Sequence, residues 1–156
     1  MIRHADLEAP ERELVAAARA ARRRAHAPYS GFKVGAAIRS RDARTFSGCN
    51  VENVSLSAGL CAERAALVQA VAAGVRPGQL RAVAVYTGAD PPCPPCGVCL
   101  QFLVEFARDL DVLLANERGV ERWRLTALLP RPFRSFPGAG DGRRGRARRG
   151  GGGRRR

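Results

Sequence analysis

The sequence has no long apolar run, and this absence bounds what the protein can be. No stretch approaches the roughly 18 consecutive apolar residues that a membrane-spanning helix needs. The N-terminal residues carry charges and lack the apolar core of a signal peptide. We therefore expect a cytoplasmic protein with no membrane partner. In that reducing compartment, the five cysteines are expected to be metal ligands, catalytic groups or packed thiols, not disulfide partners.

Lysine is nearly absent, because Lys33 is the only lysine among 27 basic residues. The formal net charge is +13, and eight arginines lie in residues 137–156. This Arg/Gly-rich tail has no large apolar residue to bury, so we expect it to be disordered. Residues 1–136 are then expected to form one domain. A basic tail can bind nucleic acid through its phosphates, but we expect a solvated extension and no nucleic-acid partner beyond that tail.

Hydrophobic periodicity indicates an α/β fold. It predicts helices at residues 10–27, 60–73 and 96–109, and strands at 32–40, 44–53, 80–88, 111–116 and 123–130. This order favours a three-layer α/β/α domain on a mixed five-stranded sheet. In such folds, sites form at the carboxyl end of the sheet beside helix N-termini.

Three of the five cysteines crowd into the stretch PPCPPCGVC, residues 91–99. Cys93 and Cys96 have the spacing of a redox pair, while Cys96 and Cys99 have the same spacing and suit half of a metal site. The stretch alone leaves both interpretations open. Cys61 opens another expected helix, and three thiolates from two helix starts make most of a tetrahedral zinc shell. We expect Cys61, Cys96 and Cys99 to bind one zinc ion, with Cys93 left as a free thiol.

Two charged residues follow Cys61 where they can serve such a metal. Glu63 lies two residues after a ligand, so it can sit beside the ion without binding it, as a proton shuttle does. Three thiolates leave an electron-rich zinc that is a poorer Lewis acid, so a nearby cation is expected to compensate. Arg64 can do this by donating hydrogen bonds to a ligand sulfur. We therefore expect Glu63 to be catalytic and Arg64 to tune the metal.

These residues belong to a longer pattern. The segments YSGFKVGAA, GCNVEN, CAERAAL, PCGVCLQFLVEF and LLPRPF occur in an order that resembles the zinc-dependent cytidine deaminases, specifically the small homotetrameric type with three cysteine ligands. The resemblance spans residues 29–133. It implies one Zn²⁺ per chain, a homotetramer, and hydrolytic deamination of cytidine and 2′-deoxycytidine in pyrimidine salvage.

The resemblance also implies roles for individual residues. Glu63 takes a proton from the attacking water, delivers it to N3 of cytosine and helps to protonate the leaving ammonia. The implied substrate-binding residues are Asn50 and Glu52 at the ribose 3′-hydroxyl, Phe32 near the base, the Ala62 backbone at the pyrimidine carbonyl, and Phe133 in a neighbouring subunit's site.

Two positions depart from the family pattern. Leu56 stands where many relatives have an aromatic residue, which puts one stacking contact from a neighbouring subunit in question. Leu100 stands where relatives usually have arginine after the last zinc cysteine. That loss of charge near the metal gives Arg64 more weight.

Other functions remain open at this stage. A related deaminase could take another aminopyrimidine nucleoside or a nucleotide, although Glu52 would repel a nearby phosphate. A nucleic-acid-binding protein with a structural zinc would draw on the arginine tail and would need four protein ligands, with Cys93 as the fourth. A Cys93–Cys96 redox pair would need a thioredoxin-like context and would leave Cys61 and Glu63 without a purpose.

Overall fold

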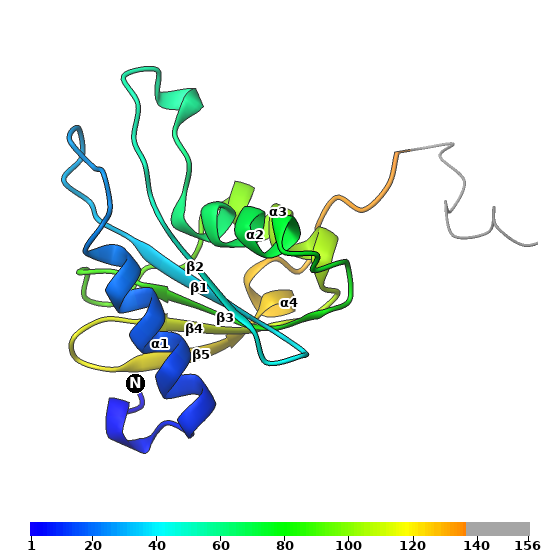
Figure 1. The fold of residues 1–156 in the computed structure, drawn as a ribbon, viewed down its shortest axis with the longest axis horizontal. Helices are drawn as coiled ribbons and strands as arrows, with labels where there is room; N and C mark the ends of the chain where they lie inside the picture. The colour runs from blue at the N-terminus through cyan, green and yellow to red at the C-terminus, as the bar shows by residue number, and fades with distance from the viewer. Residues whose placement is uncertain (137–156) are drawn as a thin grey trace, which may run out of the picture.

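A computed structural model gives the fold and describes residues 1–136 (Figure 1). The elements are the 3₁₀ turns His4–Asp6 and Leu56–Ala58, helices α1 Ala9–Arg22, α2 Ala62–Ala72, α3 Gly97–Phe106 and α4 Leu125–Leu128, and strands β1 Gly35–Ser40, β2 Thr45–Cys49, β3 Leu80–Tyr86, β4 Asp111–Ala115 and β5 Val120–Arg124. The strands form one sheet in the order β2-β1-β3-β4-β5. Only β3 and β4 are parallel neighbours, so the predicted mixed five-stranded sheet is confirmed. The predicted tail lies outside the described residues.

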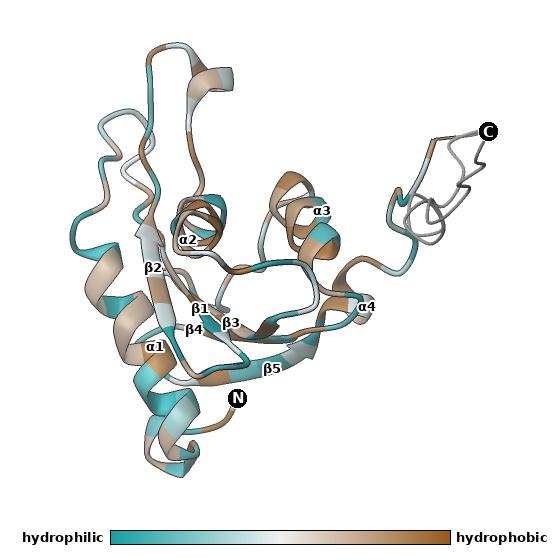
Figure 2. Ribbon diagram, turned by 45° about the vertical axis from the view of Figure 1, so that its right-hand side comes forward, coloured by the Kyte–Doolittle hydropathy of each residue, from teal (hydrophilic) through white to brown (hydrophobic). Residues whose placement is uncertain are grey.

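The sheet lies between two helical layers, as Figure 2 shows. Alternate strand residues point to opposite faces, so Ala37 and Ala84 pack with Leu14 of α1. Ile38 and Val83 belong to the core on the other face, which α2 and α3 cover. The predicted α/β/α architecture is therefore confirmed. Within the part of the chain that the structure describes, no helix is both long and apolar enough to cross a membrane.

Two glycines let helices approach the β1–β2 hairpin from both sides. A Cβ atom at Gly35 of β1 would collide with the Ala18 carbonyl and the Arg22 backbone of α1. A Cβ atom at Gly48 of β2 would lie 2.5 Å from the backbone nitrogen of Ala66 in α2. The hairpin is thus held between α1 and α2 at backbone-to-backbone distance.

Helix α1 is shorter than its sequence predicts. It ends at Arg22 rather than at residue 27, because the following residues pair with the chain that leaves β2. The His26 amide donates to the Asn50 carbonyl at 3.0 Å, and the Glu52 amide donates to the His26 carbonyl at 2.8 Å. These hydrogen bonds are made in place of a further turn of helix, and they bring Glu52 against the turn that follows α1.

The sequence predicts the last strand at residues 123–130, but only residues 123 and 124 of that range lie in a strand. The last strand, β5, ends at Arg124, and the next four residues form α4. Leu125 is fully buried in the core, and the Thr126 hydroxyl donates to Asp109 Oδ1 at 3.2 Å. A short apolar run is compatible with a helix or with a strand. Here the buried Leu125 and the hydrogen bond from Thr126 to Asp109 favour the helix.

Candidate zinc centre and adjoining cavity

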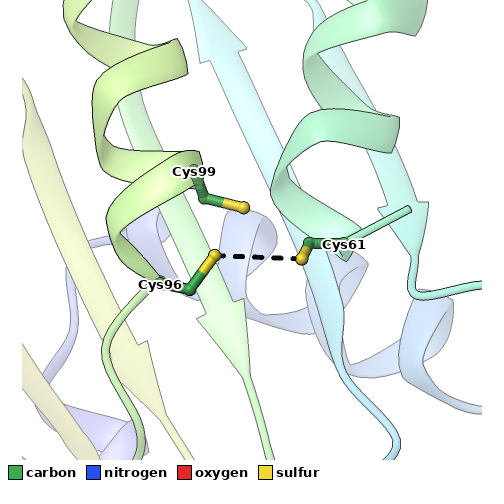
Figure 3. A group of neighbouring side chains, drawn as sticks. All are labelled: Cys61, Cys96 and Cys99. Atoms are coloured by element: carbon green, nitrogen blue, oxygen red, sulfur yellow. Dashed lines mark hydrogen bonds between the residues drawn. The ribbon is translucent and has the colours of Figure 1, made fainter. Parts of the chain in front are cut away.

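The three predicted cysteine ligands meet where two helices begin. Cys61 is the N-cap of α2, Cys96 is the N-cap of α3, and Cys99 lies in the first turn of α3. Figure 3 shows the side chains converging between the two helices. Their Sγ atoms lie within 4.8 Å of one another, with Cys61 and Cys96 at 3.9 Å. Zn–S bonds of about 2.3 Å in a tetrahedron separate sulfurs by roughly 3.8 Å, so the cluster fits a zinc ion.

The thiols of this cluster ionise unequally. A hydrogen bond from Cys99, helped by Arg64 and Cys96, lowers the pKa of Cys61 to about 5. The pKa of Cys99 is raised, because Cys99 donates that hydrogen bond and is buried. The lowered pKa of Cys61 favours a thiolate at this position, and a thiolate attracts a metal cation.

Arg64 lies against the same cluster, as expected. Its Nη2 donates to Cys61 Sγ at 3.8 Å and to the Gly59 carbonyl at 3.1 Å. The hydrogen bond to Cys61 also raises the pKa of Arg64, so the guanidinium stays charged. The positive charge of this guanidinium, held beside the Cys61 sulfur, draws electron density away from the cluster.

Glu63 is buried beside the cluster, with 5% of its surface exposed. Burial raises the pKa of its carboxyl, and the negative charge of Cys61 adds to the shift. Glu63 lines a cavity of about 210 Å³ that also contacts Cys61 and Cys96. The Glu63 carboxyl, which can exchange protons, therefore lies in the same cavity that a metal bound to these thiols would face.

Most of the predicted binding residues line this cavity too. They are Phe32, Asn50, Glu52 and Ala62. The structure adds lining residues without an assigned role in the sequence: Ser30, Val34, Val85, Thr87, Cys93 and Pro94. Thr87 had a usable signal, because it directly follows the buried strand β3, where sites in this fold class form. Thr87 is 1% exposed, and its hydroxyl accepts a hydrogen bond from the Cys93 amide at 3.5 Å.

Cys93 lies near the cluster without joining it. It lines the cavity, yet among the described residues the metal-ligating group contains only Cys61, Cys96 and Cys99. Cys93 forms no disulfide. The geometry therefore groups three of the cysteines, and the expectation that Cys93 stays a free thiol remains a prediction.

Asn50 and Glu52 organise the turn that carries Phe32. Asn50 Nδ2 donates to the Phe32 carbonyl at 2.8 Å, and Asn50 Oδ1 accepts from the Val34 amide at 2.8 Å. Glu52 Oε2 accepts from the Tyr29 and Ser30 amides at 2.9 and 3.2 Å, and Oε1 accepts from the Ser30 hydroxyl. The Ser30 hydroxyl and these amides lower the pKa of Glu52, which keeps it ionised.

Phe133 is not among the residues that line the cavity of its own chain. Gln101 of α3 holds its backbone in both directions, donating to its carbonyl at 2.7 Å and accepting from its amide at 3.1 Å. Phe133 is 56% exposed, and its ring packs edge-to-face on Phe136, with centroids 5.1 Å apart. Of the two departures from the family pattern, Leu56 is 80% exposed and Leu100 is buried in the core.

Fold and cluster together define an α/β protein with a cysteine zinc site beside a cavity that holds a buried carboxyl. The family model described as the cytidine and deoxycytidylate deaminase zinc-binding region matches residues 9–114, and the chain belongs to this family. A cytidine deaminase of Sporosarcina psychrophila is 41% identical over 123 residues, covering 78% of this chain and 89% of the relative.

Solved structures agree with this assignment. The crystal structure of cytidine deaminase from Burkholderia pseudomallei has a TM-score of 0.75 and 47% identity, and the match covers 78% of this chain and 97% of that one. The cytidine deaminase from Mycobacterium tuberculosis has a TM-score of 0.69 and 38% identity, with 82% and 100% covered.

Proposed function

We propose that this protein hydrolyses cytidine and 2′-deoxycytidine to uridine and 2′-deoxyuridine, releasing ammonia, in pyrimidine salvage. One observation carries the proposal: a three-cysteine cluster that fits zinc and the buried Glu63 share one cavity. The names of the relatives support the same activity. Cys61, Cys96 and Cys99 would hold the zinc ion, one per chain.

The chain's own groups provide the proton transfers. A zinc ion held by Cys61, Cys96 and Cys99 would act as a Lewis acid and lower the pKa of a water molecule. Glu63 accepts a proton from the attacking water, passes it to N3 of cytosine and then helps to protonate the leaving ammonia. Water is consumed and ammonia released, so the reaction balances without a further reactant. Arg64 counters the charge of the thiolates, and the Ala62 backbone contacts the pyrimidine carbonyl.

Spare hydrogen-bonding capacity supports ribose binding by Asn50 and Glu52. An amide nitrogen carries two hydrogens, and Asn50 Nδ2 uses one of them on Phe32. A carboxylate accepts about four hydrogen bonds, and Glu52 accepts three, with the remaining capacity on Oε1. A free donor and a free acceptor together suit a hydroxyl group. The negative charge of Glu52 disfavours a nearby phosphate, which supports nucleosides over nucleotides as substrates.

A neighbouring subunit is proposed to complete the site. Phe133 projects an exposed ring from a backbone that Gln101 fixes, as a residue that reaches another chain would. We propose a homotetramer in which Phe133 contributes to an adjacent cavity, while Phe32 packs near the base in its own. Size-exclusion chromatography with light scattering tests this assembly, and a stable monomer with full activity would contradict it.

The remaining proposals concern the tail and the location. We propose that residues 1–136 form the catalytic domain, that residues 137–156 are an appendage, and that the protein works in the cytoplasm. A protein that used zinc structurally to bind nucleic acid would need a fourth ligand, and Cys93 lies outside the cluster in the described residues. Deleting residues 137–156 separates the two functions, because the enzyme is expected to keep its nucleoside turnover.

The direct test measures zinc per chain and cytidine turnover on the same sample. A zinc-loaded protein is expected to release ammonia and to lower the absorbance of cytidine as uridine forms. A panel of other aminopyrimidine nucleosides and of cytidine nucleotides, run beside cytidine, tests for a related deaminase. Zinc-loaded, assembled protein that leaves cytidine unchanged would overturn the proposed function.

A further inference from the structure

The cavity wall formed by residues 32–34 is held by side chains rather than by sheet pairing alone. Asn50 binds the Phe32 carbonyl and the Val34 amide, as described above. The carbonyl between them, on Lys33, accepts a hydrogen bond from Arg22 Nε at 3.0 Å. Three successive residues of this wall are therefore fixed, two by Asn50 and one by Arg22.

Arg22 reaches this wall from the opposite helical layer. It is the last residue of α1, which covers the face of the sheet away from α2 and α3. The Arg22 backbone also lies directly over Gly35, the first residue of β1. Because the helix cannot shift relative to the strand at that contact, the reach of the guanidinium is set by the fold.

The same guanidinium lies against Gly88, next to the cavity-lining residue Thr87. A Cβ atom at Gly88 would lie 2.5 Å from Arg22 Nη2 and 3.4 Å from Cζ. Gly88 directly follows Thr87, which lines the cavity, and leads into the segment with Cys93. The backbone of Gly88 is outside the left-handed region, so the glycine provides space for Arg22 and not a special turn.

We propose that Arg22 is a positioning residue that ties the wall at residues 32–34 to the wall after β3 and so sets the width of the nucleoside cavity. It touches neither the metal cluster nor the cavity itself. Its loss therefore loosens substrate binding while leaving the proton transfers of Glu63 and the thiols of the cluster in place. The kinetic part of this inference rests on the proposed deaminase function.

Arg22→Met tests the proposal, because it keeps the aliphatic stem and removes every donor. Losing a hydrogen bond from a charged donor is expected to raise the KM for cytidine about tenfold, with kcat and zinc per chain within about twofold of wild type. Arg22→Lys, which retains a donor, is expected to recover part of the affinity. Arg23→Met is the matched control: it removes the same charge from the adjacent exposed residue, which makes no side-chain hydrogen bond among the described residues.

Gly88→Ala provides an independent perturbation. Its methyl group is expected to displace the flexible guanidinium and to reproduce the KM of Arg22→Met. If both variants break one contact, the double variant is no worse than either single variant. Multiplicative effects in the double variant, or an Arg22→Met KM equal to that of Arg23→Met, would overturn the proposal.

Amide hydrogen exchange gives a readout that does not need catalysis. Peptides covering residues 31–36 are expected to exchange faster in Arg22→Met and Gly88→Ala than in wild type, and to be unchanged in Arg23→Met. Equal exchange in all four proteins would reject the tie between the walls. If wild-type protein left cytidine unchanged, the proposed function would fail, and the exchange experiment would still decide the role of Arg22.

Discussion

The two halves of the candidate site are built in different ways. The metal half consists of the cysteine cluster Cys61, Cys96 and Cys99 with Glu63 beside it, and the nucleoside half consists of the residues proposed to bind the substrate, Phe32, Asn50 and Glu52. The metal half stands on the first residues of two helices, and Glu63 is 5% exposed. The nucleoside half lies on the chain before β1 and after β2, and Phe32 is 43% exposed.

The difference teaches how each half obtains its rigidity. Helix geometry and burial fix the metal half, because a residue at a helix start has a defined direction. The nucleoside half depends on side chains that bind backbone, with Asn50, Glu52 and Arg22 holding the turn. Disturbing the first half should abolish chemistry, whereas disturbing the second should weaken binding.

Removing a metal ligand should have the largest effect. Cys99→Ser is expected to lose most of its zinc and its activity together, and to unfold at a lower temperature, because metal binding stabilises the folded state. Zinc per chain, turnover and a thermal melt measure this. Cys93→Ser is the control and should keep its zinc; equal zinc loss in both variants would contradict the assignment of the trio.

Removing Glu63, the proposed proton shuttle, should lower the rate of the chemical step while leaving zinc binding intact. Glu63→Gln has the same size and is expected to lower kcat by about 10²- to 10⁴-fold with zinc content unchanged. Steady-state kinetics and metal analysis on one preparation test this. The exposed Glu105→Gln in α3 should behave as wild type. A Glu63→Gln rate close to wild type would show that the mechanism is wrong.

Removing the charge behind the ligands should have an intermediate effect. Arg64→Met loses the hydrogen bond to Cys61, and changes of this kind typically cost about 10- to 100-fold in metal affinity or activity. Chelator competition and kcat measure the two losses separately. Arg108→Met removes an exposed arginine and is expected to change neither. If metal affinity and kcat were both unchanged in Arg64→Met, the hydrogen bond from Arg64 to Cys61 would contribute to neither, which would contradict the prediction.

Weakening the nucleoside half should give the smallest loss and a different kinetic signature. Glu52→Gln keeps the shape but loses the charge that binds the Ser30 hydroxyl and the turn amides. KM for cytidine is expected to rise about tenfold, with kcat and zinc nearly unchanged. A fall in kcat with KM unchanged would place Glu52 with the metal half and break the comparison.

Sequence patterns could predict the metal half better than the nucleoside half. Cys61, Cys96 and Cys99 were predictable because ligand spacing and helix starts are local properties of the chain. The early end of α1 was not, since His26 leaves the helix to pair with Asn50 and Glu52, a partner distant in sequence. Helix α4 was not predictable either, because its apolar sequence is compatible with a helix or a strand and the burial of Leu125 favours the helix.

The tie from Arg22 to Lys33 also had no local signal. One arginine among several at the end of α1 reaches a backbone carbonyl eleven residues away, and only the packed structure selects it. Thr87 was partly predictable, because it follows a buried strand, but its place in the cavity wall depends on the loop that returns through Cys93.

The close packing of the hairpin at Gly35 and Gly48 also fixes strand register. Gly35 lies opposite Cys49, and Ala36 lies opposite Gly48, so each glycine faces its own helix. A slip of either strand by one residue would push a side chain into a helix backbone, which makes alternative pairings sterically forbidden. The chain entering β1 and the chain leaving β2 carry the nucleoside half. This packing therefore sets which residues stand opposite each other in the hairpin. In a library of all single substitutions, these two glycines should be among the least tolerant positions outside the residues proposed to bind the metal and the substrate.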